Sequence, residues 1–387
     1  MIKLIKSTFH NEADTKAKIT EFITNAPMLS MGEQCAAFEQ AFAKKQGRTY
    51  ATFVNSGSSA NLVLIQTLLN TGRLKQGDRV AFSALTWPTN VMPVIQLGLI
   101  PVPVDCELDT LNASLRQLQA LTEKPACFFL TNVLGFCDDI DAIRDYCNAE
   151  KIILIEDNCE SLGSKIKGTL LGNFGVAATF SFFVGHHLST IEGGMIVTDD
   201  EDLYEMLALV RAHGWERNLP DNRKPVYRAK FNIDPFYARY TFFDVAYNVR
   251  PTEIQGFIGT LQLPYWDEIV SARERQYRRV AAVIAKNPDL MPLKSEHMEI
   301  VSNFAVPVIA RNDSSYKTYR DRFEKGDVEI RPVIAGNMTH QPFYKKYGFE
   351  PGACPNADVI HARGFYFGNN PDMTEDELQT FETLLTP

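Results

Sequence analysis

Two adjacent histidines, His186 and His187, interrupt the apolar run Ser181–Leu188 just ahead of the turn Glu192-Gly193-Gly194. An imidazole has an ordinary pKa near 6.5, so it can take up and return a proton at neutral pH. The pair is therefore a candidate for general acid–base chemistry. The alternative is that both histidines are polar residues at the end of a strand in a chain without catalysis.

A second candidate is the segment Asn55–Asn61, Asn-Ser-Gly-Ser-Ser-Ala-Asn, which follows an apolar strand and opens a helix. Its small residues let the backbone approach a phosphate, and the free N–H groups and dipole of the helix start hold negative charge. A Ser or Asn helix cap without a ligand explains this segment equally well.

Acidic residues end the apolar strand Ile153–Ile155, with Asp157 as the main candidate and Glu160 shortly after it. A carboxylate there can keep a pyridine nitrogen protonated, which makes a cofactor ring an electron sink. Glu160 is expected near the ring hydroxyl. A metal site or a solvated strand end are the alternatives.

Aromatic and basic residues supply further candidates. Trp87, in a loop between a strand and a helix, could stack on a flat ring, although a lone tryptophan more often packs in a core. Arg217, Arg250 and Arg331 are candidates for binding nucleotide phosphates, because a guanidinium pairs with phosphate through two hydrogen bonds. His213 is interpreted first as a hydrogen-bonded structural histidine, and it is also a candidate for substrate binding.

The elements that must position these residues alternate regularly. From about residue 51 to 200, short apolar runs alternate with amphipathic stretches, a rhythm typical of repeated β-α units. Such units build a mostly parallel sheet with helices on both faces, and ligands bind beyond the carboxyl ends of its strands. We predict an α/β fold with a large domain over residues 1–264 and a smaller α+β domain over 265–387. Residues 221–251, rich in aromatic and basic side chains, are predicted to form an irregular excursion, as a lid or an oligomer contact.

The composition is that of an ordinary globular protein. The chain has 387 residues, 45% of them hydrophobic, and a net charge of -8, which argues against nonspecific nucleic-acid binding. No apolar stretch approaches the span of a bilayer, and Met1–Phe9 does not resemble a secretory signal, so we expect a cytoplasmic protein. The seven cysteines show no paired spacing, which argues against a disulfide framework, an iron–sulfur cluster or a metal site.

Four motifs in register resemble the DegT-type sugar aminotransferases, a branch of the fold-type-I pyridoxal-phosphate enzymes. The matching segments are Asn55–Asn61, Glu156–Asn158, Ser181-Phe182 with Glu192–Gly194, and Tyr247–Glu253. The resemblance implies the aminotransferase fold. It also implies that Asp157 contacts the pyridine nitrogen, that Trp87 stacks on the ring, and that Gly57, Ser58 and Ser181 hold the phosphate. Asn248 would join them from a neighbouring subunit, which implies a homodimer with shared active sites.

In that family, the position of His186 normally carries the lysine that binds the cofactor covalently. A histidine there, together with the segments around Trp87, Asp157 and His213, resembles the few members that remove a hydroxyl group. The resemblance implies noncovalent pyridoxal or pyridoxamine phosphate, loaded from glutamate. It further implies loss of the 3-hydroxyl from a nucleotide-linked 4-keto-6-deoxy sugar like GDP-4-keto-6-deoxymannose, on the way to colitose in a lipopolysaccharide O-antigen. His186 would be the base, and His187 its structural neighbour. One departure is Gly185, where a serine is expected.

Three other functions remain open at this stage. A related dehydrase also has histidine here but uses an iron–sulfur cluster, for which this chain lacks paired cysteines. A nucleotide-sugar aminotransferase that works without the lysine would retain the amino group on the sugar, whereas a dehydratase releases ammonia. A noncatalytic protein that binds pyridoxal phosphate would consume no amino acid.

Overall fold

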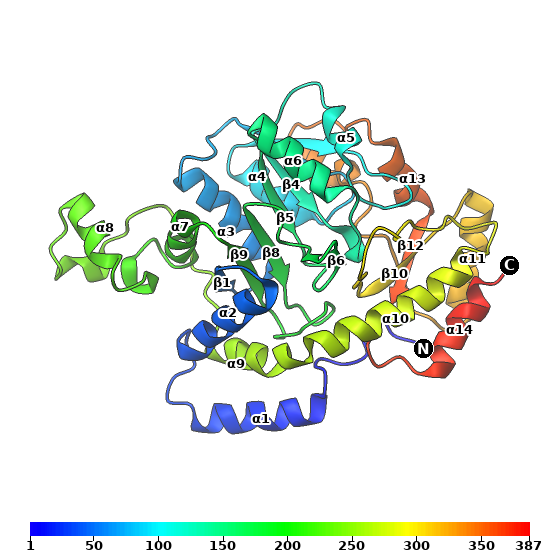
Figure 1. The fold of residues 1–387 in the computed structure, drawn as a ribbon, viewed down its shortest axis with the longest axis horizontal. Coiled ribbons are helices and arrows are strands. Elements are labelled where there is room, and N and C mark those ends of the chain that lie inside the picture. Colours follow the sequence, from blue (N-terminus) through cyan, green and yellow to red (C-terminus); the bar gives the residue numbers. More distant parts are fainter.

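A seven-stranded sheet forms the centre of the protein in a computed structural model that describes residues 1–387 (Figure 1). The strand order is β1-β9-β8-β5-β4-β2-β3. Neighbouring strands from β8 to β3 run parallel, and β9 is antiparallel to both β1 and β8. The strands are β1 (Tyr50–Val54), β2 (Arg79–Ser83), β3 (Ile100–Val104), β4 (Cys127–Thr131), β5 (Ile153–Asp157), β8 (Ala177–Ser181) and β9 (Gly194–Thr198). The predicted α/β class with a mostly parallel sheet is confirmed.

Both faces of this sheet are buried. In β4, Phe128 and Leu130 belong to one hydrophobic core, whereas Cys127 and Phe129 belong to another. Since successive side chains of a strand point to opposite faces, the two cores lie on opposite sides of the sheet. This is why β4 reads as a continuous apolar run and not as an alternating one.

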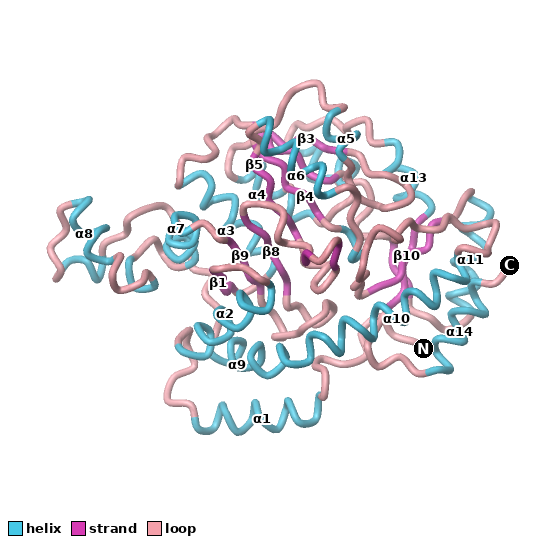
Figure 2. Tube along the Cα trace, viewed as in Figure 1, coloured by secondary structure: helices cyan, strands magenta, loops and turns pink.

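The helices cover the sheet and continue beyond it. The helices up to residue 262 are α1 (Glu12–Asn25), α2 (Glu33–Gln46), α3 (Gly57–Asn70), α4 (Met92–Gln96), α5 (Leu115–Gln119), α6 (Ile140–Glu150), α7 (Glu201–Arg211), α8 (Lys224–Phe231) and α9 (Glu253–Gln262). Figure 2 shows most of these helices around the strands, with α1 outermost beneath α9 and α8 on a projection away from the sheet. A stacked pair of rings, Phe22 and Phe257, joins α1 to α9 at a centroid distance of 4.2 Å.

The C-terminal part contains a three-stranded antiparallel sheet, β10-β12-β11. Its elements are α10 (Trp266–Ile284), β10 (Ala305–Ile309), α11 (Asp313–Lys325), β11 (Ile330–Pro332), α12 (Pro342–Lys346), α13 (Pro355–Arg363), β12 (Gly364–Gly368) and α14 (Glu375–Leu385). A two-stranded hairpin, β6 (Lys165–Ile166) with β7 (Thr169–Leu170), completes the strands. The long helix α10 runs from the base of the large sheet to this second sheet (Figure 1). The domain boundary near residue 265 stays a prediction.

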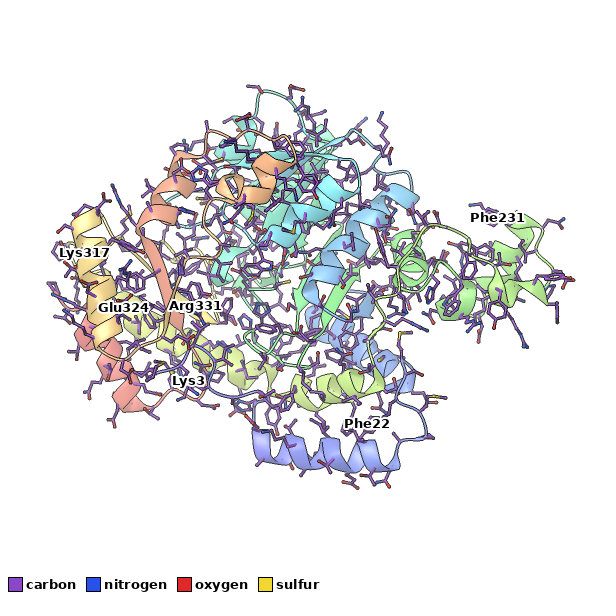
Figure 3. All side chains as sticks on the ribbon, turned by 180° about the vertical axis from the view of Figure 1, so that it is seen from behind. Lys3, Phe22, Phe231, Lys317, Glu324 and Arg331 are labelled. Atoms are coloured by element: carbon purple, nitrogen blue, oxygen red, sulfur yellow. The ribbon has the colours of Figure 1, made fainter.

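An arm formed by α8 and a short 3₁₀ helix, Tyr237–Tyr240, projects from the body of the molecule (Figure 1). Sequence reasoning predicted irregular structure here, but the arm contains an ordered helix. Pro225 in the first turn favours its start, and Asn232, in the left-handed region with φ of 53°, ends it. Figure 3 labels Phe231 on this arm, far from the rest of the chain. The arm exposes several large apolar side chains: Val226, Phe231, Phe236, Tyr237, Tyr240, Phe242 and Val245.

No helix of this chain has the length and apolar character needed to cross a membrane.

Candidate active site

A cavity of about 320 Å³ lies where the carboxyl ends of β5 and β8 meet the start of α3. Parallel strands commonly gather ligand-binding loops at this edge of the sheet. The cavity is lined by seven residues predicted from the sequence: Gly57, Ser58, Trp87, Asp157, Glu160, Ser181 and His186. The structure thus brings together residues that are up to 129 positions apart, while their individual roles stay predictions.

The start of α3 approaches the end of β8 closely. A Cβ atom placed on Gly57 would lie 2.7 Å from Cβ of Ser181 and 3.1 Å from Sγ of Cys159. Ser56 caps the helix, and its Oγ accepts a hydrogen bond of 3.0 Å from the N–H of Ser59. The remaining N–H groups of the first turn have no partner within the helix, and the helix dipole is positive at this end. A residue larger than glycine would force Ser181 to shift, and this helix start suits a phosphate.

Asp157 is buried and held at both carboxylate oxygens. Its Oδ2 accepts hydrogen bonds from the side-chain amides of Asn61, at 2.9 Å, and Asn90, at 2.8 Å. Its Oδ1 accepts the backbone N–H of Cys159 at 2.9 Å. These donors fix the orientation of a negative charge in the cavity. Sequence reasoning missed Asn90, because a single asparagine in a distant loop carries no signal of its own.

The preceding residue, Glu156, has a different environment. Its carboxylate accepts backbone N–H groups of Gly172, Phe174 and Gly175 at 2.7–2.8 Å. Because side chains alternate along a strand, Glu156 points away from the cavity that Asp157 faces. It therefore holds the loop after β7 in place, and Asp157 is the carboxylate available to a ligand.

Glu160 lines the same cavity and is 5% exposed. Burial and, to a smaller extent, the charge of Asp157 raise the pKa of its carboxyl to about 8, against an opposing hydrogen bond from the N–H of Leu134. Glu160 is therefore protonated at neutral pH and can donate a hydrogen bond into the cavity.

His186 lies at the border of the cavity, with its ring between two aromatic rings. The ring centroids of Phe183 and Phe304 lie 5.8 Å and 5.3 Å away. Burial and, to a smaller extent, the positive charge of Arg273 lower the pKa of His186 to about 4. The imidazole is therefore neutral at pH 7, which is the form that can accept a proton.

His187 points elsewhere. It is buried, does not line the cavity, and its Nε2 lies 3.1 Å from the backbone oxygen of Ser302. Burial lowers its pKa well below the ordinary value. The ring thus ties the histidine loop to the segment before β10.

Trp87 is 50% exposed and stands at the rim, where Pro88 begins a 3₁₀ turn. One apolar wall is Phe183, in the predicted histidine run. The other apolar walls come from parts of the chain that sequence reasoning did not connect with the site: Leu4, Ile5, Phe304, Ile334 and Tyr366. Two hydrogen bonds of Leu4 fix the N-terminal segment there. The N–H of Leu4 donates to the carboxylate of Glu329, and the carbonyl of Leu4 accepts from the side-chain amide of Asn370.

The other predicted residues do not line the cavity within one chain. Three of them surround the indole of Trp215: His213 at 4.6 Å between centroids, the guanidinium of Arg217 at 4.0 Å, and that of Arg250 at 5.5 Å. Asn248 is exposed, and its Oδ1 accepts a hydrogen bond of 2.9 Å from Nε of Arg250.

Arg331 lies on β11, is exposed, and pairs with Glu329 at 2.6 Å. Figure 3 shows it on the opposite side of the molecule from the arm.

A mostly parallel sheet, with a helix start suited to a phosphate and an oriented aspartate at its carboxyl edge, is the arrangement of an α/β enzyme of the aminotransferase fold. The chain belongs to the DegT/DnrJ/EryC1/StrS aminotransferase family, whose profile matches residues 10–384.

Among its relatives is the GDP-4-keto-6-deoxy-D-mannose 3-dehydratase of Escherichia coli O55:H7, 35% identical over 96% of this chain and 97% of that protein. The enzyme of the same name from Yersinia pseudotuberculosis is 34% identical over 94% of this chain and 93% of that protein.

Solved structures agree with this membership. The E. coli GDP-4-keto-6-deoxy-D-mannose-3-dehydratase with bound hydrated PLP superposes with a TM-score of 0.90, at 32% identity, over 100% of this chain and 99% of that one. A histidine-to-asparagine variant of GDP-4-keto-6-deoxymannose-3-dehydratase with bound GDP-perosamine has a TM-score of 0.91 at 32% identity, and coverage is 100% of both chains.

Proposed function

We propose that this protein is a pyridoxal/pyridoxamine-phosphate-dependent 3-dehydratase of a nucleotide-linked 4-keto-6-deoxy sugar. The observation that carries the proposal is the composition of the cavity: its border carries the neutral imidazole of His186, and no lysine lines it. Relatives that share the fold over the whole chain are named 3-dehydratases of GDP-4-keto-6-deoxymannose. The sugar and nucleotide proposed here are therefore of that type.

The residues of the cavity fit the cofactor. Gly57 and Ser58 at the start of α3, with Ser181 beside them, would hold the phosphate, and the space left by the missing Cβ of Gly57 permits the close approach. Asp157 would stabilise a protonated pyridine nitrogen, Glu160 would donate a hydrogen bond to the ring hydroxyl, and Trp87 would stack on the ring. When bound, the cofactor supplies an amine for the sugar ketone and a ring that accepts electrons.

His186 carries the proton transfers in this proposal. The low pKa of His186 keeps its imidazole free of a proton at pH 7. The imidazole can therefore accept a proton from the methylene carbon of the bound pyridoxamine phosphate. The resulting imidazolium can return that proton to the 3-hydroxyl as it leaves. An imidazole forms no stable covalent bond with the cofactor, so noncovalent contacts alone would hold the cofactor. Glutamate is the proposed amino donor.

We further propose a homodimer in which each active site uses residues of both chains. Asn248 is exposed on this chain, and His213, Arg217 and Arg250 form a basic, aromatic group around Trp215 beside the arm. A partner chain would bring Asn248 to the phosphate and these residues to the substrate's nucleotide. Arg331 is proposed as a further phosphate contact, because its guanidinium is exposed near the small sheet.

The decisive experiment incubates the protein with pyridoxal phosphate, glutamate and a panel of 4-keto-6-deoxy nucleotide sugars. Mass spectrometry and an ammonia assay then follow the products. A product that has lost water, together with released ammonia, supports the dehydratase. An amino group retained on the sugar would instead support an aminotransferase, a function favoured by the relationship to GDP-perosamine synthase of E. coli O157:H7, 27% identical over 94% of this chain and 92% of that protein.

A further inference from the structure

A buried arginine lies directly behind the histidine loop. Arg273, on α10, is 4% exposed, and its guanidinium donates only to backbone carbonyls. Nη2 donates to the carbonyl of His186 at 3.2 Å, and Nη1 donates to the carbonyls of Asn369 and, at 3.5 Å, Asn303. One side chain therefore joins the histidine loop to both the segment before β10 and the end of β12.

The charge of this guanidinium is not neutralised by a contact. None of the ion pairs of the chain includes Arg273. Burial lowers its pKa to about 9, while the charge of Asp372 acts in the opposite direction, so the guanidinium stays charged at pH 7. A buried cation without an ion-pair partner in contact is unfavourable for folding. The position of the charge, next to His186, suggests a use for it.

His186 separates two cavities with different linings. The main cavity, described above, presents Asp157, Cys159, Glu160, Glu192 and Tyr366 as its titratable groups other than His186. A second, smaller cavity of about 30 Å³ presents His10, His187, Arg273 and Asp372. The main cavity therefore holds the carboxylates of Asp157 and Glu192 together with a Glu160 that is uncharged at pH 7, whereas the positive charge of Arg273, which disfavours a protonated imidazole, acts from the second cavity.

We propose that Arg273 is a positioning residue for His186: it fixes the backbone of the histidine loop and, through its charge, keeps the imidazole uncharged and ready to accept a proton. The proposal rests on the proposed role of His186 as the base. Arg273 does not line the main cavity, so it acts through His186 and not on the substrate.

The test separates the charge from the hydrogen bonds. Arg273→Gln removes the charge and keeps a donor, whereas Arg273→Lys keeps the charge with fewer donors. The titration of His186 is followed by NMR in protein labelled at the histidine ring carbons, and the resonance is assigned by its loss in His186→Asn. This readout requires no turnover, so it remains informative even if no sugar of the panel is a substrate.

We expect His186 in the unsubstituted protein to stay neutral down to about pH 5. Arg273→Gln should raise its pKa by about 1 or more, and Arg273→Lys should leave it nearly unchanged. In turnover, Arg273→Gln should shift the acid limb of the pH–rate profile upward and lower kcat, whereas a loss of structure alone would lower kcat without moving that limb. An unchanged pKa of His186 in Arg273→Gln would overturn the proposal.

A second variant covers the case in which Arg273→Gln does not fold. Gln262 is buried and lines the second cavity, where its Oε1 accepts the N–H of His10 at 2.9 Å. Gln262→Glu keeps that acceptor, loses the hydrogen bonds that Nε2 donates to the carbonyl of His10 and to Oγ1 of Thr15, and adds a negative charge that opposes Arg273. The pKa of His186 should then rise as well, and the same pKa as in the unsubstituted protein would count against a charge-based role of Arg273.

Discussion

The carboxyl groups of Asp157 and Glu160 face one cavity but have different surroundings. Asp157 accepts three hydrogen bonds, whereas Glu160 accepts one and has a pKa raised to about 8, mainly by burial. The charge of Asp157 contributes to that rise. Two carboxyl groups in such different surroundings can serve one cofactor differently, the first as a hydrogen-bond acceptor and the second as a hydrogen-bond donor.

The first prediction concerns Glu160. Its pKa is raised from 4.5 in the unfolded chain to about 8, so its contribution to stability is fully present below pH 4.5 and is lost as the pH rises towards 8. Glu160→Gln should therefore lose less stability than the unsubstituted protein between pH 5.5 and 8.5, as measured by urea unfolding. Activity above pH 8 should also fall less steeply in the variant.

Glu192→Gln is the matched control, because Glu192 lines the same cavity but is exposed. The same pH dependence of unfolding in Glu160→Gln and in the unsubstituted protein would contradict a neutral Glu160.

The second prediction concerns the contact between Gly57 and Ser181. Gly57→Ala places a Cβ 2.7 Å from Cβ of Ser181, so we expect a loss of about 1–3 kcal/mol in the free energy of unfolding and a marked loss of affinity for pyridoxal phosphate. Calorimetry and absorbance titration measure the two effects. Removing the opposing Cβ in Gly57→Ala/Ser181→Gly should recover part of the stability, with Ser181→Gly alone completing the double-mutant cycle.

The third prediction concerns His186. Replacing it by lysine should abolish dehydration and let the amine bind the aldehyde of pyridoxal phosphate covalently, because the side chain borders the cofactor cavity. Borohydride reduction followed by intact-mass measurement detects that bond. His186→Asn, which offers neither a base nor an amine, should be inactive without any gain in mass. Full dehydration by His186→Lys would disprove the role of His186 as base.

The fourth prediction concerns Gly185, where relatives led us to expect serine. A Cβ at this position would lie 3.0 Å from Cε1 of Phe183 and 3.2 Å from Cδ1 of Ile5, both in movable side chains. Gly185→Ser should therefore cost less than about 1.5 kcal/mol of stability but narrow the cavity between Ile5 and Phe183. A raised KM with little change in kcat is expected. A KM equal to that of the unsubstituted protein would show that this wall does not contact the substrate.

Much of the large sheet could be predicted because its signals are local. The apolar strand expected before Asn55 is β1, the expected strand at Ile153–Ile155 is β5, and the helix expected within Asn55–Asn61 is α3. The strand order and the antiparallel β9 could not be predicted, since pairing depends on contacts between distant residues. The arm was expected to be irregular because its many aromatic residues obscure the sequence pattern of the short helix α8.

The candidate site divides in the same way. The motifs around Gly57 and Asp157 directly follow a strand, so their chemistry can be predicted from a few consecutive residues. Leu4, Phe304 and Arg273 carry no such signal, because only the packing of the N-terminal segment and the C-terminal part against the large sheet brings them to His186. Asn248 and Arg217 lie outside the cavity of a single chain, and their predicted roles depend on a second copy.

The last prediction tests that second copy. His186→Asn and Asn248→Ala should each be inactive or nearly so as homodimers. If each site combines His186 of one chain with Asn248 of the other, a mixed dimer has one doubly substituted site and one intact site. Random mixing of the two variants should then restore about a quarter of the unsubstituted activity, and mixed dimers purified by two tags about half. If Asn248 instead serves the site of its own chain, every site in a mixed dimer carries one substitution, and no activity should return.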